Sequence, residues 1–216
     1  MRIDLHCHTK YSPDSLTTID SLLRWMDRRE LDMVAITDHN TIAGALDFHS
    51  RAPDRFLVGE EIKTTRGELL ALFIGEEVPP GLSIQETMAR VRAQGGLVGV
   101  SHPLDRVRSD AVGRDVLDEI HAQLDFVEVL NARTTFRGDN QQARELAAGW
   151  GLPGSAGSDA HASCEVGKAY VELASFDGPA AFLEGLAQGQ VRGGLSNPLV
   201  HLFSRYATWR RRLGAE

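Results

Sequence analysis

The sequence predicts an α/β protein that folds as a barrel of strands and helices. Short apolar runs alternate with longer segments of helical periodicity, a pattern typical of parallel α/β architectures. Polar residues able to bind metal follow at least six successive strands, at the point where each strand ends. An open doubly wound sheet also carries its site at strand ends, but in one crevice. Polar clusters after this many strands favour a closed ring, whose site lies at the C-terminal rim.

Length and composition indicate an ordinary globular protein. The chain has 216 residues, with 42% hydrophobic and 25% charged residues and a net charge of −7. The acidic balance argues against broad, non-specific binding of nucleic acid. No signal peptide or membrane-spanning run of about 18 apolar residues is evident, so we expect a cytoplasmic protein. We expect a single domain over 1–216, with its core in 1–175 and C-terminal helices in 176–216.

The expected elements follow from apolar periodicity and capping residues. An opening strand contains Ile3 and Leu5, and a hairpin-like turn is expected at residues 65–67. Thr17 with Asp20 resembles a helix capping box, and Ser83 with Glu86 forms a clear one. Further strands are expected over 32–37, 56–58, 68–74, 97–100, 126–130, 154–156 and 169–173. Helices are expected over 17–29, 42–50, 84–94, 110–124, 139–149, 178–188 and 198–213.

The opening strand ends in a His-x-His motif. Alternate side chains of a strand share a face, so His6 and His8 point the same way and can bind one metal ion. Asp14 follows in a turn marked by Ser12-Pro13, close enough to fold back. An isolated His-x-His pair is as often two solvent-facing histidines on an edge strand. The same residue types return after three later strands, which favours the metal site.

Together these strand ends supply eight candidate metal ligands. Imidazole with carboxylate suits zinc, manganese or iron rather than calcium. Eight ligands are too many for one tetrahedral ion and suit two or three ions bridged by a carboxylate, an arrangement that hydrolyses phosphoesters. The candidates are His6, His8, Asp14, His39, Glu61, His102, Asp159 and His161.

These motifs resemble the PHP (polymerase and histidinol phosphatase) family over residues 3 to about 173. The motifs are His6-x-His8, Asp14, Thr37-Asp38-His39, Gly59-x-Glu61, Ser101-His102-Pro103 and Gly157-Ser158-Asp159-Ala160-His161. The resemblance implies a distorted (β/α)7 barrel with a trinuclear metal site. It implies that one ion is held by His6, His8, Glu61 and Asp159. A second would be shared between Glu61 and His102, and a third held by Asp14, His39 and His161.

One departure from the family concerns the second ion. Many members carry a further histidine near the strand that here covers 68–74, and this chain has none there. We expect Glu76 or Glu77, just beyond that strand, to substitute. Otherwise the second ion is weakly held and the site is binuclear.

Two further residues are candidates for catalytic roles. Asp38 is expected either to orient His39 or another imidazole, or to cap a helix. Arg133 follows a strand without a metal ligand and is suited to bind a phosphate with its bidentate fork. Lys63 and Arg106 are weaker candidates for that role. Two cysteines and three histidines are expected to be structural or ordinary surface residues: Cys7, Cys164, His49, His121 and His201.

The expected function is hydrolysis of a small phosphorylated substrate, such as a nucleotide or sugar phosphate, by a metal-bridged hydroxide. The alternatives are an exonuclease that trims short oligonucleotides, a cyclic amidohydrolase and a non-catalytic PHP scaffold. The longest rim segments, 62–83 and 103–112, are too short to form a separate binding domain, which favours a small substrate. The basic amphipathic helix over 198–213 is expected to pack on the domain with a solvated basic end. No membrane association is expected.

Overall fold

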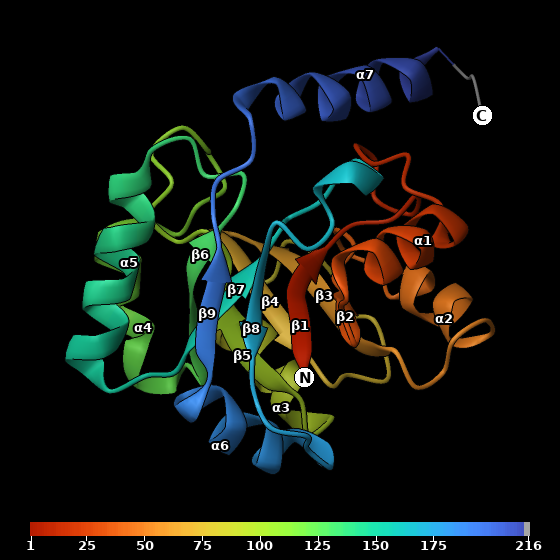
Figure 1. Ribbon diagram of the computed structural model, residues 1–216. Helices are drawn as coiled ribbons and strands as arrows, with labels where there is room; N and C mark the ends of the chain where they lie inside the picture. The colour runs from red at the N-terminus through yellow and green to blue at the C-terminus, as the bar shows by residue number, and fades with distance from the viewer. Residues whose placement is uncertain (214–216) are drawn as a thin grey trace.

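The fold is a mixed sheet curled into a nearly closed barrel, described here over residues 1–213 of a computed structural model (Figure 1). The sheet has the strand order β7-β6-β5-β4-β3-β2-β1-β8-β9. Its strands are β1 (Arg2–Cys7), β2 (Met33–Ile36), β3 (Phe56–Thr64), β4 (Gly67–Leu72), β5 (Leu97–Val100), β6 (Phe126–Asn131), β7 (Gly154–Gly157), β8 (Ala169–Glu172) and β9 (Gln190–Gly193).

Helices surround this sheet and close its two ends. They are α1 (Ile19–Arg29), α2 (Ala43–His49), α3 (Ile84–Ala93), α4 (Gly113–Ile120), α5 (Arg137–Trp150), α6 (Gly178–Gln188) and α7 (His201–Arg212). Figure 1 shows α6 at the base of the barrel and α7 across the opposite end, above the C-terminal ends of β1 and its neighbours. The expected α/β barrel is therefore confirmed.

The barrel closes at its C-terminal rim through the segments that follow β1 and β7. Cys7 and Ala160 form an isolated parallel bridge, and the Asp159 N–H donates to the His6 carbonyl at 2.7 Å. At the other end of β1, the antiparallel pair of β8 and β9, which α6 connects, takes the neighbouring position, because β8 pairs antiparallel with β1 from Arg2 and Ile3. The two metal-binding motifs at the start and the end of the sequence are thereby brought side by side.

Three buried apolar clusters hold the barrel together. The helices and strands differ from the expected ones in only a few places. The expected hairpin at 65–67 joins β3 to β4, and β4 is antiparallel to both of its neighbours. The segment 62–83 therefore includes the end of β3 and all of β4 and is not one continuous rim loop. The N-cap of α1 is Thr18, which accepts from the Ser21 N–H, so the predicted Thr17 box is wrong by one residue. The Ser83–Glu86 capping box is confirmed.

Candidate metal centre

All eight predicted ligands lie together at the C-terminal rim of the barrel, beneath α7. Six of them are buried, and the side chains of the other two, Asp14 and His39, are half-buried. Seven are delivered by a strand end or by the loop that follows it, as the sequence pattern predicted, whereas Glu61 lies within β3. Groups of their nitrogen and oxygen atoms lie within 4.8 Å of one another, which is close enough to hold metal ions.

Glu61 is the centre of this cluster. Its Oε2 lies 3.2 Å from His6 Nε2 and 3.3 Å from His8 Nε2, while its Oε1 lies 3.0 Å from His102 Nε2. The same Oε2 lies 3.3 Å from His39 Nδ1. A carboxylate with both oxygens directed at imidazole nitrogens is suited to bridge two ions. Glu60 points to the other face of β3 and accepts from the Val78 N–H at 2.9 Å, so the predicted register holds.

Hydrogen bonds fix the tautomers of the two histidines in the first motif. Ser12 Oγ donates its hydrogen to Asp38 Oδ1 at 2.6 Å, so it must accept from His8 Nδ1 at 3.0 Å. On His6, Nδ1 donates to Glu128 Oε1 at 3.0 Å. Both rings therefore direct Nε2, the nitrogen available to a metal ion, toward the centre, where the two Nε2 atoms lie 3.0 Å apart. A second partner of this kind is typical of metal-binding histidines.

Asp38 acts through Ser12 rather than by touching an imidazole. Its carboxylate also accepts from the Thr9 N–H at 2.7 Å and from Thr9 Oγ1 at 2.6 Å. Among the described hydrogen bonds Asp38 makes none to His39, and it does not cap α2, whose N-cap is Ile42, so the expected role that remains is the orientation of another imidazole. Asp38 therefore positions His8, one residue further from the centre than predicted.

A third part of the cluster joins Asp14 to two imidazoles. His161 Nε2 lies 2.9 Å from Asp14 Oδ2, and its Nδ1 donates to the Asp159 carbonyl at 2.8 Å. His39 Nε2 lies 3.8 Å from Asp14 Oδ1. The Nδ1 hydrogen bond thus directs His161 Nε2 toward the centre, as in the rings of His6 and His8.

Glu68 joins the cluster, although the sequence analysis did not assign it. Glu68 Oε1 lies 3.6 Å from His39 Nδ1, and its Oε2 lies 3.9 Å from His102 Nε2. Glu77 accepts instead from Thr41 Oγ1 at 2.5 Å, outside the centre, so the expectation that Glu76 or Glu77 substitutes for the missing histidine is wrong. The antiparallel β3–β4 pairing explains this, because it points Glu68, near the start of β4, into the rim.

Two of the candidate ligands adopt left-handed backbone conformations. His102 has φ +28° and Asp159 has φ +53°, values that cost energy for residues with a Cβ. Each is held by a short hydrogen bond of its own N–H: His102 to Glu128 Oε2 at 2.6 Å, and Asp159 to the His6 carbonyl at 2.7 Å. Strain stabilised in this way at the centre itself is typical of functional sites.

The charges of the centre shift the pKa values of its members in opposite directions. Burial opposes the charged form of His8, but the neighbouring carboxylates of Asp159 and Glu61 outweigh it and raise its pKa to about 9. Burial and the neighbouring His8 charge lower the pKa of His161 to about 4. Burial, together with the charges of Glu61 and Asp110, raises the pKa of Glu68 to about 9. Without cations, the centre thus retains protons on some groups and excludes them from others.

The donor set fits divalent transition-metal ions. Several buried carboxylate oxygens have no hydrogen-bond donor among residues 1–213, although burying such an atom without a partner is costly. Imidazole nitrogens surround these oxygens but do not satisfy them by hydrogen bonds. Bound cations would supply the missing partners. The unpartnered oxygens are Glu61 Oε2, Glu68 Oε2, Asp159 Oδ1 and Asp14 Oδ1.

Two arginines meet beside this cluster in a polar cavity of about 240 Å³. Arg108 forms an ion pair with Asp159 Oδ2. Arg133 is only 3% exposed; its Nε lies 3.5 Å from Glu165 Oε2, and its Nη2 donates to Ser204 Oγ of α7 at 2.9 Å. The cavity is lined by Asp14, Val107, Arg108, Ser109, Asp110, Arg133, His161, His201 and Ser204.

Other predicted cations do not reach this cavity. Arg106 instead pairs with Asp139, and Lys63 is exposed on β3. Arg108 lies two residues beyond Arg106, in the expected rim segment 103–112. It lines the cavity and was not predicted from the sequence. His201, expected to be an ordinary histidine, lies on the wall of the cavity.

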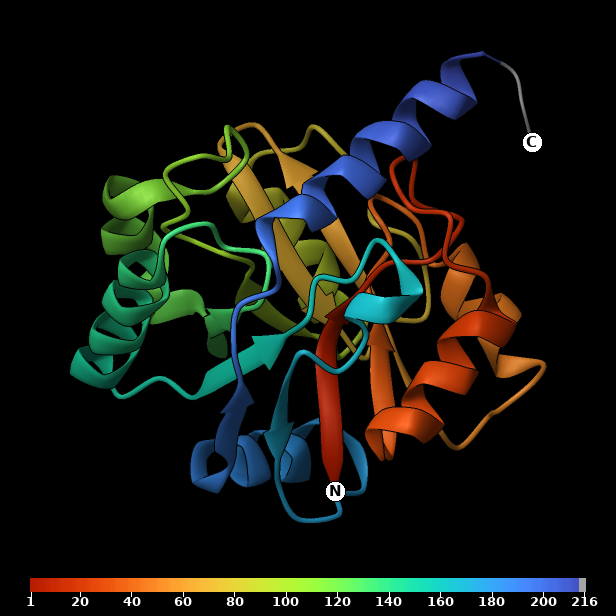
Figure 2. The same cartoon turned by 45° about the horizontal axis from the view of Figure 1, so that its top comes forward.

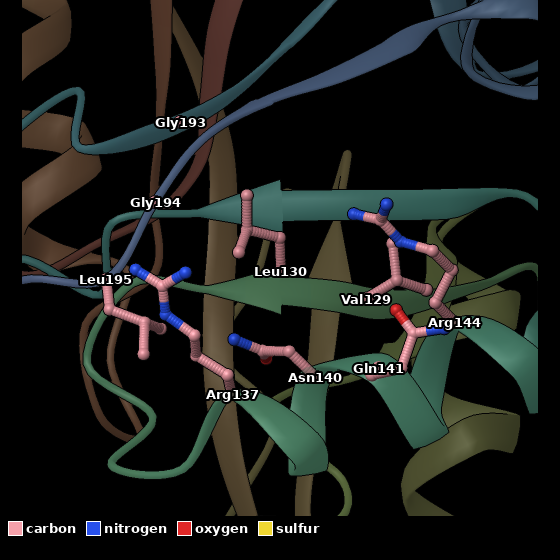
Figure 3. Close-up of a pocket in the computed structure, with 9 residues that line it drawn as sticks. All are labelled: Val129, Leu130, Arg137, Asn140, Gln141, Arg144, Gly193, Gly194 and Leu195. Carbon is pink, nitrogen blue, oxygen red and sulfur yellow. The ribbon is translucent and has the colours of Figure 1, made fainter.

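A second cavity of about 240 Å³ lies on the other side of His161 and is more apolar. Leu16 and Thr17 form one wall, and Phe203 and Tyr206 of α7 form another. A third hollow, of about 250 Å³, lies outside the barrel, between α5 and the segment after β9 (Figure 3). Arg137 and Arg144 flank it, and none of the candidate metal ligands lines it, so it is separate from the centre.

Comparisons with known proteins agree with this geometry. The PHP domain family model matches residues 4–80, and the model of the PHP-associated C-terminal region matches residues 137–191. An uncharacterized protein of Methanocaldococcus jannaschii, MJ1587, is 38% identical over 145 residues, which are 61% of this chain and 82% of that protein. A second uncharacterized protein of that organism, MJ0417, is 34% identical over 180 residues, 82% of this chain and 72% of that protein.

Among solved structures, the fold is similar to a two-domain protein of Bacteroides vulgatus that contains a predicted PHP-like metal-dependent phosphoesterase. The TM-score is 0.73 at 15% identity, over 96% of this chain and 69% of that chain. Across residues 1–213, no helix has the length and apolar character needed to cross a bilayer.

Proposed function

Because this chain belongs to the PHP domain family, we propose that it is a metal-dependent phosphoesterase that hydrolyses a small phosphorylated substrate. The observation that carries the proposal is the position of Arg108 and Arg133. Their cavity adjoins the cluster of imidazoles and carboxylates and shares Asp14 and His161 with it. A phosphoryl group in this cavity would meet cations on one side and the metal ligands on the other.

In this proposal the ligands divide among two or three ions. His6, His8, Glu61 and Asp159 would hold one, Glu61, His102 and Glu68 a second, and Asp14, His39 and His161 a third. Bound ions of this kind generate a nucleophile at neutral pH and stabilise the charge of the phosphoryl oxygens and leaving group.

The remaining chemistry belongs to the residues of the chain. Arg133 presents a planar guanidinium to the phosphoryl oxygens, for which its bidentate geometry is suited. Glu165, 3.5 Å away, and Ser204 hold that guanidinium in place. Arg108 would exchange its contact with Asp159 for one with the substrate when ions compensate the carboxylate. The α7 helix excludes water from one side of the cavity.

The size of the cavities and the position of α7 favour a small substrate. About 240 Å³ accommodates a phosphoryl group with a sugar-sized moiety, and the apolar cavity beside Phe203 and Tyr206 is suited to a base or ring. A long nucleic acid strand would need several phosphate contacts, and α7 lies across its path. We therefore propose a nucleotide or sugar phosphate as the substrate, in preference to an oligonucleotide.

The experiment compares hydrolysis of a nucleoside monophosphate, a nucleoside bisphosphate and a short single strand by manganese- or zinc-loaded protein at two salt concentrations. We expect a higher kcat/KM for the small phosphoesters. Arg133→Ala should lower kcat/KM about 10²-fold and leave the metal content unchanged, while Arg114→Ala, on the surface of α4, should change neither. A preference for the strand that weakens with salt would support the exonuclease, and no hydrolysis of any phosphoester by metal-loaded protein would overturn the proposal.

A further inference from the structure

The α7 helix packs on the barrel with its large apolar side chains turned toward solvent. Its inner face is small and polar. Leu202, Trp209 and Leu213 are 58%, 57% and 64% exposed. The basic end is largely exposed to solvent, as expected, but most of the large apolar side chains of the helix are exposed with it.

Helical spacing explains how the two faces separate. Leu202, Tyr206, Trp209 and Leu213 follow one another at intervals of four, three and four residues and form one stripe. The opposite stripe has the same spacing and consists of Val200, Ser204, Ala207 and Arg211. Ser204 accepts from Arg133, Ala207 is buried, and Arg211 donates to the Ser15 carbonyl at 3.0 Å. These inner contacts fix the rotation of the helix and thereby turn the leucines and the tryptophan outward.

Nothing in residues 1–213 covers this outer stripe. Figures 1 and 2 show α7 along the outside of the rim, with no other element on its outer side in either view. The stripe is convex, a ridge rather than a groove. An apolar ridge of this kind, exposed to solvent, marks a site of association.

The charges beside the stripe identify the kind of partner. Arg205 and Arg212 lie along one edge of the stripe, both are exposed, and residues 198–213 contain no aspartate or glutamate. This differs from the rest of the chain, which carries a net charge of −7. The partner should therefore be both apolar and negatively charged. Pairing with α7 of a second copy would place arginines against arginines without a compensating carboxylate.

We infer that the outer face of α7 binds the surface of an anionic lipid bilayer, with the helix lying in the plane of the interface. Leucine and tryptophan enter the boundary between headgroups and acyl chains, while arginines at the edge of the stripe meet anionic headgroups. Leucines gain little from nucleobases, and three of the four stripe residues, Leu202, Trp209 and Leu213, line neither catalytic cavity, which disfavours a nucleic acid strand on this face. The catalytic rim would lie next to the bilayer.

The test is co-sedimentation of the metal-loaded full chain with vesicles of two compositions. We expect binding to vesicles of equal parts phosphatidylglycerol and phosphatidylcholine that is about tenfold stronger than to phosphatidylcholine alone, and weaker at high salt. The double variant Leu202→Gln/Trp209→Gln should lose this binding. Arg205→Gln/Arg212→Gln should lose the preference for the anionic lipid.

A matched control keeps the test specific to α7. Leu46 on α2 is also 58% exposed, so Leu46→Gln removes the same exposed side chain elsewhere and should leave vesicle binding unchanged. The two α7 variants should keep their metal content and phosphoesterase rate, because their side chains face away from the centre. A blue shift of tryptophan emission on vesicle binding that disappears in Trp209→Phe would place this residue in the interface.

Three results would overturn the inference. Equal binding of wild type and Leu202→Gln/Trp209→Gln to the anionic vesicles would exclude this face. A concentration-dependent dimer in sedimentation velocity that the same variant abolishes, without vesicle binding, would assign the face to a second copy. Retention of a single-stranded RNA by this face, without vesicle binding, would assign it to nucleic acid.

Discussion

Glu68 places a carboxylate in the cluster, and its oxygens lie 3.6 Å from His39 and 3.9 Å from His102. We predict that Glu68→Gln weakens the binding of one ion by about 10–100-fold or more, because an amide replaces a charged ligand. Elemental analysis after dialysis should show the loss of about one ion per chain. Glu68→His should retain that ion.

The control for Glu68 is Glu77, whose carboxylate is bonded to Thr41 outside the centre. Glu77→Gln should leave the metal content unchanged. If Glu77→Gln removed an ion and Glu68→Gln did not, the original expectation for the missing ligand would be restored.

Metal binding should release protons, because at least two of the ligands hold protons in the metal-free centre, and the carboxylates of Glu61 and Glu128 also raise the pKa of His6 well above its usual value despite its burial. His8 and Glu68 both have pKa values raised to about 9, so both are protonated at pH 7.5 and must be deprotonated to bind a metal. As pH rises from about 6 to 9, fewer protons compete and the apparent affinity should increase. Calorimetric titration with Mn²⁺ in two buffers of different ionisation enthalpy should give about two or more protons released. Affinity that increases as pH falls would contradict this assignment.

At the scale of an element, the start of α2 packs against the residues that position His8. A Cβ on Gly44 would overlap Asp38 Oδ2 and lie 2.5 Å from Thr9 Oγ1. Gly44→Ala should therefore lower the free energy of unfolding by about 1–3 kcal/mol and weaken metal binding, because it disturbs the hydrogen bonds from Asp38 through Ser12 to His8. Urea unfolding and elemental analysis measure the two effects.

Gly149 on α5 provides the comparison for Gly44. No atom would lie within 4 Å of a Cβ there, so Gly149→Ala should stabilise the protein by about 0.5–1 kcal/mol through helix propensity alone. Equal effects of the two substitutions would mean that the contact of Gly44 with Asp38 carries no energy.

The elements that periodicity reveals were predictable, and those that depend on tertiary contacts were not. The apolar runs at 97–100 and 126–130 stand out, and both are strands within a residue of the expected bounds. The β9 strand, Gln190–Gly193, was missed because it is short and largely polar and packs at an exposed edge of the sheet. No local signal marks such a strand.

The same distinction applies to the centre. The spacing of His6 and His8 predicts that both are ligands, but Glu68 can be recognised only once the antiparallel pairing of β4 is known. Arg108 is one of several arginines near the rim, and only the path of the loop after β5 brings it to Asp159. The role of Asp38 depends on Ser12, a contact that no spacing rule predicts.

In the whole molecule, the hydrophobic core and the helix that covers the site are formed by separate parts of the chain. None of the three apolar clusters of the core includes a residue from 198–213. Yet α7 lines both cavities at the centre, through His201 and Ser204 on one side and Phe203 and Tyr206 on the other. The barrel alone should therefore fold and bind metal, while α7 determines what reaches the metals.

This separation predicts the effect of removing α7. A chain that ends at Asn197 should keep its metal content, and its Tm should fall by only a few degrees, as expected when about 1 kcal/mol or less is lost from a domain of this size. Without α7, the rim is open, and Arg133 loses the bond to Ser204. The kcat/KM for a nucleoside monophosphate should fall relative to that for a short single strand, by about tenfold, equivalent to roughly 1.4 kcal/mol of transition-state binding. The Leu202→Gln/Trp209→Gln variant, in which α7 still crosses the rim, should show the wild-type ratio. An unchanged ratio in the shortened chain would mean that the loops of the barrel, and not α7, select the substrate.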